Sequence, residues 1–365
     1  MIPLIKPIIP FESVEADLRA ILDSGQLTSG RYVAKFEKML AEYLGVAHAV
    51  TTTSATTALH MSMEAMKIAD GDEVLVSDFS FPASGNAVVQ TGAAPVFVDC
   101  VPGRFDLDPA DLKKRITPKS KAIMVVHPFG QPADMTRINE IAARHNLKVI
   151  EDAACGLGTR HGNRLCGTLS DAGCFSFHPR KLLNTGEGGL IATNDLGLYQ
   201  MLTVLRTHGG TRDEVGLQFL ENGFNYRMTE MQAALGLSQL GGFEESLVER
   251  RRLATLYLER FAKVPGVSVP LSAPAGDCTF QSFVVLFDDK INRNHVVAEL
   301  RQRCIESTLG TYAMHSQKAF ERYGYKPGDL PHSMRAQRQS LTLPLFANMG
   351  DDTIDRIVTE IASLV

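Results

Sequence analysis

The fold of this chain is decided by the stretch Cys174-Phe175-Ser176-Phe177-His178-Pro179-Arg180-Lys181, which the glycine-rich segment Thr185-Gly186-Glu187-Gly188-Gly189 follows. Its aromatic residues predict a buried strand, and Pro179 ends that strand because proline has no N–H to donate to a sheet. Lys181 is therefore expected at the mouth of a sheet. Many lysines at such positions only extend toward water. Desolvation, however, can lower the pKa of a lysine and make its amine a nucleophile toward aldehydes.

A carboxylate 29 residues upstream favours the second interpretation. Val149 and Ile150 indicate a strand buried on both faces, which is typical of a parallel sheet, and Asp152 closes it. An acid at the carboxyl end of such a strand lies where open α/β sheets bind ligands. Alone, Asp152 could simply cap a helix. Together, a Schiff-base lysine and a carboxylate that keeps a pyridine nitrogen protonated are what pyridoxal 5'-phosphate requires.

Length and composition set the class of protein. The chain has 365 residues, enough for two or three structural domains, and its 44% hydrophobic and 21% charged residues are ordinary for a globular protein. The net charge of −4 gives no basic surface for nucleic acid or membrane. We expect no signal peptide and no membrane span. The six cysteines form no Cys-x-x-Cys pair, so we expect reduced thiols, no metal site and a cytoplasmic protein.

The chain alternates predicted strands and helices through its first half. Strands are expected at 47–53, 73–77, 95–99 and 121–127, and helices at 33–44, 56–66, 83–90, 109–115 and 135–145. This rhythm, with short connections, predicts an α/β fold with a mostly parallel sheet flanked by helices. A helix is expected at 196–208, then a glycine-rich loop, then a long helix at 230–261 with a bend at Gly241-Gly242. Strands near 281–287 and 341–344 and helices near 295–303 and 352–364 predict a smaller α+β domain.

Several motifs together resemble the DegT/DnrJ/StrS family of sugar aminotransferases over nearly the whole chain. They are Gly71-Asp72-Glu73-Val74, Pro95-Val96-Phe97-Val98-Asp99, Gly130-Gln131-Pro132-Ala133-Asp134, Glu151-Asp152-Ala153-Ala154, Ser176-Phe177-His178 with Lys181, Thr185-Gly186-Glu187-Gly188-Gly189 and Asn225-Tyr226-Arg227-Met228. The resemblance implies the fold-type-I architecture, whose large domain holds a mostly parallel seven-stranded sheet. We expect residues 1–245 to form an N-terminal segment and this cofactor-binding domain, and residues 246–365 to form the small domain.

The resemblance also implies roles for single residues. Lys181 matches the Schiff-base lysine and Asp152 the acid that pairs with the pyridine nitrogen. The expected cofactor contacts are Ser54, Ala55, Thr56, Phe81, Cys155, Ser176 and Asn225, and the expected substrate contacts are His315, Thr28 and Ser29. Ala55 replaces the usual glycine, and Cys155 stands where a glutamine often contacts the ring hydroxyl, so the role of Cys155 stays open. For Phe81 the alternative is a core phenylalanine, and for Asn225 a loop residue in left-handed geometry.

By resemblance, the chain is an enzyme that transfers an amino group from an L-amino acid to a keto group of a nucleotide-linked deoxysugar. L-glutamate is the expected amino donor. The alternatives for function are a cyclitol ketone as acceptor, or a regulatory protein that binds the cofactor without turnover. Asn225 matches a residue that reaches a neighbouring subunit's cofactor phosphate, so a homodimer with shared active sites is expected.

Two other classes of protein are disfavoured by the residues. In Gly156-Leu157-Gly158-Thr159-Arg160-His161-Gly162 the third glycine falls one place late for a dinucleotide-binding motif. The related sugar dehydratases carry histidine in place of the motif lysine, and this chain keeps Lys181.

Overall fold

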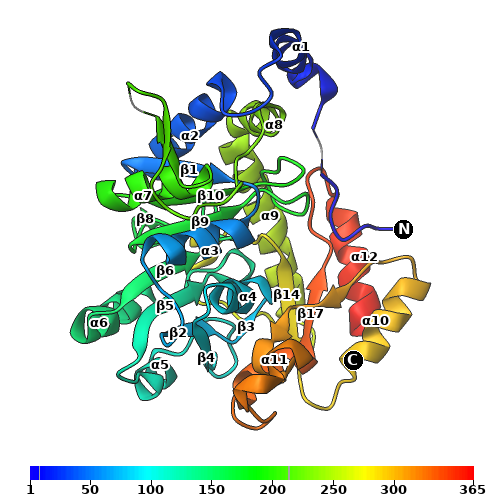
Figure 1. Ribbon diagram of the computed structural model, residues 1–365. Coiled ribbons are helices and arrows are strands. Elements are labelled where there is room, and N and C mark those ends of the chain that lie inside the picture. Colours follow the sequence, from blue (N-terminus) through cyan, green and yellow to red (C-terminus); the bar gives the residue numbers. More distant parts are fainter. Residues whose placement is uncertain (8, 213) are drawn as a thin grey trace.

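The computed structural model describes residues 1–7, 9–212 and 214–365. Its largest sheet has seven strands in the order β1-β10-β9-β6-β5-β2-β4 (Figure 1). These are β1 (His48–Thr52), β2 (Glu73–Ser77), β4 (Ala94–Val98), β5 (Ser120–Val126), β6 (Lys148–Asp152), β9 (Ala172–Ser176) and β10 (Gly189–Thr193). All neighbours are parallel except that β10 is antiparallel to β1 and β9. The predicted mostly parallel, seven-stranded sheet is confirmed.

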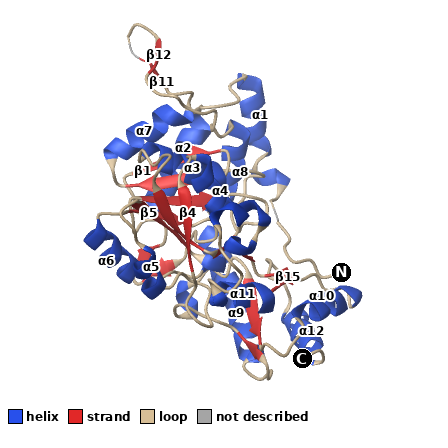
Figure 2. Cartoon of the chain, turned by 60° about the horizontal axis from the view of Figure 1, so that its bottom comes forward, coloured by secondary structure: helices blue, strands red, loops and turns tan. Residues whose placement is uncertain are grey.

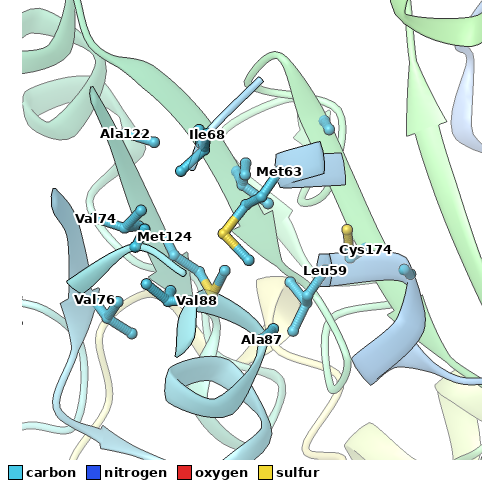
Figure 3. Close-up of a cluster of buried hydrophobic side chains, with 14 of the residues drawn as sticks. Leu59, Met63, Ile68, Val74, Val76, Ala87, Val88, Ala122, Met124 and Cys174 are labelled. Atoms are coloured by element: carbon cyan, nitrogen blue, oxygen red, sulfur yellow. The ribbon is translucent and has the colours of Figure 1, made fainter. Parts of the chain in front are cut away.

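Helices cover both faces of this sheet, which is why its strands are apolar on both sides. On one face lie α3 (Ala55–Ala65), α4 (Ala83–Gln90) and α7 (Leu196–Arg206). Figure 3 shows Leu59 and Met63 of α3 packed toward Met124 of β5, with Val88 of α4 beside them. On the other face lie α2 (Arg31–Leu44), α5 (Pro109–Arg115), α6 (Met135–His145) and α8 (Glu230–Leu240).

The carboxyl ends of six strands meet at one edge of the sheet, because β1 is parallel to β9 although β10 lies between them. At the same edge the short strand β3 (Phe79–Ser80) follows β2 and pairs with β16 (Tyr312–Ala313) from the C-terminal part of the chain. The loops that follow β1, β2, β6 and β9 therefore lie near one another, and these loops carry most of the predicted site.

The C-terminal part has a second sheet and its own core (Figure 1). The sheet has the order β13-β14-β17-β15, with β13 (Val267–Ser268), β14 (Phe283–Phe287), β15 (Thr308–Leu309) and β17 (Ser340–Leu343). Its helices are α9 (Phe243–Phe261), α10 (Arg293–Gln302), α11 (Pro331–Gln339) and α12 (Asp351–Ala362). Because α9 packs Leu247 in one core and Leu253 in the other, the border at 245/246 falls inside a helix. That border stays a prediction.

Some elements differ from those expected. The long helix at 230–261 is two helices, since α8 ends at Leu240 and α9 begins at Phe243. The glycine-rich loop before it contains a hairpin of β11 (Gly210–Arg212) and β12 (Leu217–Phe219), which projects from the body of the molecule in Figure 2. A smaller hairpin joins β7 (Arg160–His161) and β8 (Arg164–Leu165), and α1 (Glu15–Ser24) precedes α2. No described helix is both long and apolar enough to cross a bilayer.

Candidate active site

Lys181 lies in the loop that follows β9. Its backbone N–H donates to the carbonyl of His178 at 2.8 Å, which closes a turn after Pro179. The half-buried side chain reaches toward the end of β6, where Nζ lies 3.1 Å from Sγ of Cys155. The structure therefore places Lys181 beside Cys155, the residue whose role the sequence left open.

Asp152 is the last residue of β6 and is 5% exposed. Oδ2 accepts a hydrogen bond from the Ser84 hydroxyl at 2.7 Å, and Oδ1 accepts one from the Ala154 N–H at 3.2 Å. Burial raises the pKa of Asp152, while the Ser84 hydrogen bond and the positive charge of Lys181 act in the opposite direction. A carboxylate offers about four acceptor positions, so Asp152 keeps room for a further N–H donor.

The N-terminus of α3 is capped by its own hydroxyls. Ser54 Oγ accepts from the Thr57 N–H at 3.2 Å, and Thr57 Oγ1 accepts from the Ser54 N–H at 3.0 Å. The first N–H groups of the helix, on Ala55 and Thr56, have no intrahelical partner and suit an anion. Ala55 is the first residue of α3, a helical conformation that does not need glycine.

Gly189 joins this corner to the end of β9. It pairs with Thr52 across β1 and with Ser176 across β9. A Cβ at position 189 would lie 2.4 Å from the carbonyl carbon of Ser54 and 2.6 Å from Oγ1 of Thr52. Only glycine allows this approach, and as a result Ser176 and the start of α3 lie on either side of one strand. This hydroxyl-lined corner fits a phosphate group.

Phe81 follows β3 at the same edge and is 66% exposed, so the alternative of a core phenylalanine is wrong. Its ring centroid lies 6.5 Å from that of Tyr312. A large aromatic surface left open beside buried polar groups is suited to stacking on a flat ring.

The remaining predicted residues belong to loops other than that of Lys181. Asn225 is exposed, and its backbone bridges that of Thr207. Thr28 and Ser29 are exposed in the loop before α2, where the Thr28 backbone bridges Thr229. Within the described residues no hydrogen bond joins any of these side chains to Lys181, Asp152 or Cys155.

His315 is 2% exposed and is held by Asp78, the residue after β2. Its backbone N–H donates to Asp78 Oδ1 at 2.7 Å, and its Nδ1 lies 2.7 Å from Asp78 Oδ2. Nε2 is buried without a hydrogen-bond partner in the described part of the chain. The predicted substrate contact of His315 is untested.

Sequence reasoning missed residues that bond to this site, among them Ser84 and Gln281. Ser84 donates to Asp152, and Gln281 bonds to the backbone on both sides of Lys181. Ser84 lies four positions after Ser80, and their hydroxyl oxygens are 2.8 Å apart, but a pair of serines at that spacing carries no signal by itself. Gln281 is about 100 residues from the loop that it contacts, and no local pattern could have indicated it.

Comparison with known proteins shows the family. The model of the DegT/DnrJ/EryC1/StrS aminotransferase family matches residues 11–362. The chain belongs to this family. The family's members use pyridoxal 5'-phosphate, and this chain is a pyridoxal phosphate-dependent sugar aminotransferase.

Three proteins with described activities or structures are similar to this chain over most of its length. GDP-perosamine synthase of Caulobacter vibrioides is 40% identical over 332 residues, which are 90% of this chain and 89% of that protein. The structure of S. venezuelae DesV in complex with a ketimine intermediate is 32% identical, with a TM-score of 0.92, and covers 99% of this chain and 98% of that one. The structure of DesI in the presence of its TDP-sugar product is 31% identical, with a TM-score of 0.89, and covers 98% and 91%.

Proposed function

We propose that this chain transfers the amino group of an L-amino acid, with L-glutamate as the expected donor, to a keto group of a nucleotide-linked deoxysugar. In this proposal Lys181 is the residue that binds the cofactor covalently. The observation that carries the proposal is the placement of Lys181 against the end of β6. Its Nζ lies 3.1 Å from Cys155 Sγ, and its charge acts on the buried carboxylate of Asp152.

The groups at this edge fit pyridoxal phosphate one by one. The α3 N-terminus, Thr56 and Ser176 would hold the phosphate. The exposed ring of Phe81 would stack on the pyridine ring, and Asp152 would keep a proton on the pyridine nitrogen. Cys155, beside Nζ, is placed to accept a hydrogen bond from the lysine. When bound, the cofactor supplies an electron sink, and the protein supplies position and charge.

The class of acceptor is supported by the relatives. GDP-perosamine synthase and DesI, whose product is a TDP-sugar, are both more than 30% identical to this chain. Their two nucleotides differ, so the nucleotide used here is open, and a cyclitol ketone is the alternative acceptor. A panel of GDP- and TDP-linked keto sugars and cyclitol ketones with glutamate, read by the mass of the aminated product, decides among them.

The covalent role of Lys181 has a direct test. Borohydride reduction of the holoenzyme should fix the cofactor on the peptide that contains Lys181, and Lys181→Ala should abolish both this label and transamination. Lys148→Ala is the control and should retain both the label and transamination. Lys148 is the first residue of β6, at the opposite edge of the sheet, where its Nζ lies 2.8 Å from Oδ1 of Asp171. A label on another lysine would remove Lys181 from this role.

We also propose that the active unit is a homodimer with shared sites. Asn225 is exposed, and in the described part of its own chain its side chain makes no hydrogen bond to Lys181, Asp152 or Cys155, which suits a residue that serves a neighbour. The nearby hairpin presents Leu217, Phe219 and Leu220, which are 55%, 64% and 62% exposed. Such an apolar surface suits a second copy of the chain, and two-fold dimers are the commonest oligomers.

Complementation tests this sharing. Mixed dimers of Lys181→Ala and Asn225→Ala subunits should recover activity, because each such dimer holds one site with neither defect. Native mass spectrometry must show that the subunits have exchanged, and activity assays of each parent homodimer must show that it is impaired. Exchanged dimers without recovery would mean that Asn225 serves its own chain or no site.

The cytoplasmic location expected from the sequence also stays a proposal. The structure supports it to the extent that all six cysteines are free thiols. Fractionation of cells that carry the tagged protein tests it.

A further inference from the structure

The side-chain amide of Gln281 holds the backbone on both sides of Lys181. Oε1 accepts a hydrogen bond from the Leu182 N–H at 3.1 Å, and Nε2 donates one to the Arg180 carbonyl at 2.7 Å. We propose that Gln281 is a positioning residue that sets the location of Nζ of Lys181 for its reaction with the cofactor. This inference rests on the proposed covalent role of Lys181.

The loop has little else to fix it at this point. Residues 177–188 lie outside helices and strands, so no ladder of hydrogen bonds holds Lys181. Farther along, Gln239 of α8 makes a second amide contact, accepting from the Asn184 N–H at 3.1 Å and donating to the Asn184 carbonyl at 2.6 Å. Lys181 thus lies between the turn at His178 and Asn184. The Arg180 N–H also donates to Nδ1 of His178 at 3.1 Å, within the loop, and among the described residues Gln281 is the side chain from outside the loop that bonds to the immediate neighbours of Lys181.

Gln281 is itself held rigidly, which a positioning residue requires. It is 7% exposed and lies just before β14. Arg250, buried on α9, donates to the carbonyls of Phe280 and Gln281, each at 2.6 Å. On the other side, a Cβ at Gly130 would lie 2.9 Å from the Gln281 N–H nitrogen, so the large domain packs directly on this segment. The Gln281 side-chain amide therefore links the second sheet to the backbone on both sides of Lys181.

The chain offers a matched control in Gln131, another buried glutamine with two amide contacts to backbone. Its Nε2 donates to the Pro270 carbonyl at 3.0 Å and its Oε1 accepts from the Ser272 N–H at 3.0 Å. Gln131 is 5% exposed, and it too links the two parts of the chain, but among the described residues its side chain makes no hydrogen bond to the Lys181 loop. Gln131→Ala therefore removes an equivalent structural tie without the proposed positioning.

The experiment compares two cofactor forms on reconstituted apoenzymes. Pyridoxal phosphate bonds to Lys181, whereas pyridoxamine phosphate has an amine in place of the aldehyde and cannot. Gln281→Ala should lower the rate of covalent bond formation with pyridoxal phosphate by about 10–100-fold, since a misplacement of about 1 Å costs on that order. The affinity for pyridoxamine phosphate should change less than about twofold. Gln131→Ala should leave both values at the wild-type level.

Gln281→Glu is the second variant. It keeps an acceptor oxygen for the Leu182 N–H and places the other oxygen against the Arg180 carbonyl, so it should show the same selective loss in a folded protein. The proposal is overturned if both variants fold and bond pyridoxal phosphate at the wild-type rate, or if both forms of the cofactor lose affinity equally. It is also overturned if both Gln281 variants unfold while Gln131→Ala folds, because the role would then be structural.

Peptide mapping separates failure of this inference from failure of the proposed function. If wild-type enzyme carries the borohydride label on a residue other than Lys181, the proposed function itself fails. If the label is on Lys181 and the Gln281 variants react normally, only the positioning role fails.

Discussion

Glu151 and Asp152 are consecutive buried carboxylates at the end of β6, and the two side chains leave the strand on opposite faces. Glu151 is fully engaged. It bonds to Gly167 N at 2.6 Å, Leu169 N at 2.7 Å, Ser170 Oγ at 2.9 Å and His127 Nε2 at 2.9 Å. Among the described residues, the Asp152 carboxylate accepts from two groups, the Ser84 hydroxyl and the Ala154 N–H.

The difference separates a structural carboxylate from one available for chemistry. The four donors around Glu151 fill its acceptor positions and tie the segment 167–170 to the sheet. His127, which lies with Glu151 and Cys166 in a buried group of possible metal ligands, also accepts the Ala133 N–H at Nδ1. Because both imidazole nitrogens and both carboxylate oxygens are in use, we interpret this group as a hydrogen-bond network. Asp152, at the edge where open α/β sheets bind ligands, keeps acceptor capacity.

The largest effect is expected at Asp152. Asp152→Asn keeps the shape of the side chain and an acceptor for Ser84, but a neutral amide cannot stabilise a protonated pyridine nitrogen. The rate of half-transamination with glutamate in single-turnover experiments should fall about 10²–10³-fold, the usual loss when one preorganised electrostatic partner is removed. The unfolding temperature should stay close to wild type. A half-reaction at the normal rate would take Asp152 out of the mechanism.

Glu151→Gln should show the opposite pattern. One oxygen becomes an NH₂ group and then faces the N–H of either Gly167 or Leu169, neither of which can reverse its polarity. Leaving such a buried donor unsatisfied should lower the free energy of unfolding by about 1–3 kcal/mol. Denaturant titration of the apoenzyme checks the stability, and the half-reaction measured well below the transition should stay within a few-fold of wild type. A stable but inactive variant would contradict the structural role.

The sequence was sufficient for the parts of this comparison that depend on local pattern. The apolar run Val149-Ile150 predicts β6, and Asp152 closes it as expected. Pro179 ends the strand before Lys181, and Ser54 begins α3 as a hydroxyl cap should. Strands of five to seven residues buried on both faces carry strong signals, and the strands predicted at 47–53, 73–77, 95–99 and 121–127 lie within one residue of the bounds of β1, β2, β4 and β5.

What the sequence did not reveal depends on contacts between distant segments. Nothing near Glu151 in the chain indicates that it binds the segment 167–170, and nothing near Ser84 indicates Asp152, 68 residues away. The strands of β3 and β16 have two residues each, so their pairing follows from the tertiary fold and not from periodicity. The sequence did not predict the hairpin of β11 and β12, because the glycines in this segment favour a loop assignment.

The smallest expected effect is a pH dependence of cofactor binding that comes from Asp152 and not from Glu151. Burial raises the pKa of Asp152 above its ordinary value of 3.8. The folded apoenzyme then binds this proton more tightly than the unfolded chain does, so between 3.8 and the raised pKa the contribution of Asp152 to stability falls as pH rises. With a protonated pyridine ring beside it, the Asp152 carboxyl would have a lower pKa again and would lose this proton.

Pyridoxamine phosphate should therefore bind more tightly as pH rises toward the raised pKa of Asp152, by at most about tenfold per pH unit, and this dependence should level off above it. Titration of the ligand's phosphate also affects the profile, but it does so equally in Asp152→Asn. The ratio of wild-type to Asp152→Asn affinity, measured by calorimetry across the acid range, isolates the carboxylate. Glu151→Gln, compared with wild type in the same way, should show no such slope. Parallel profiles for wild type and Asp152→Asn would mean that Asp152 is already ionised in the apoenzyme and that the neighbouring positive charges outweigh its burial.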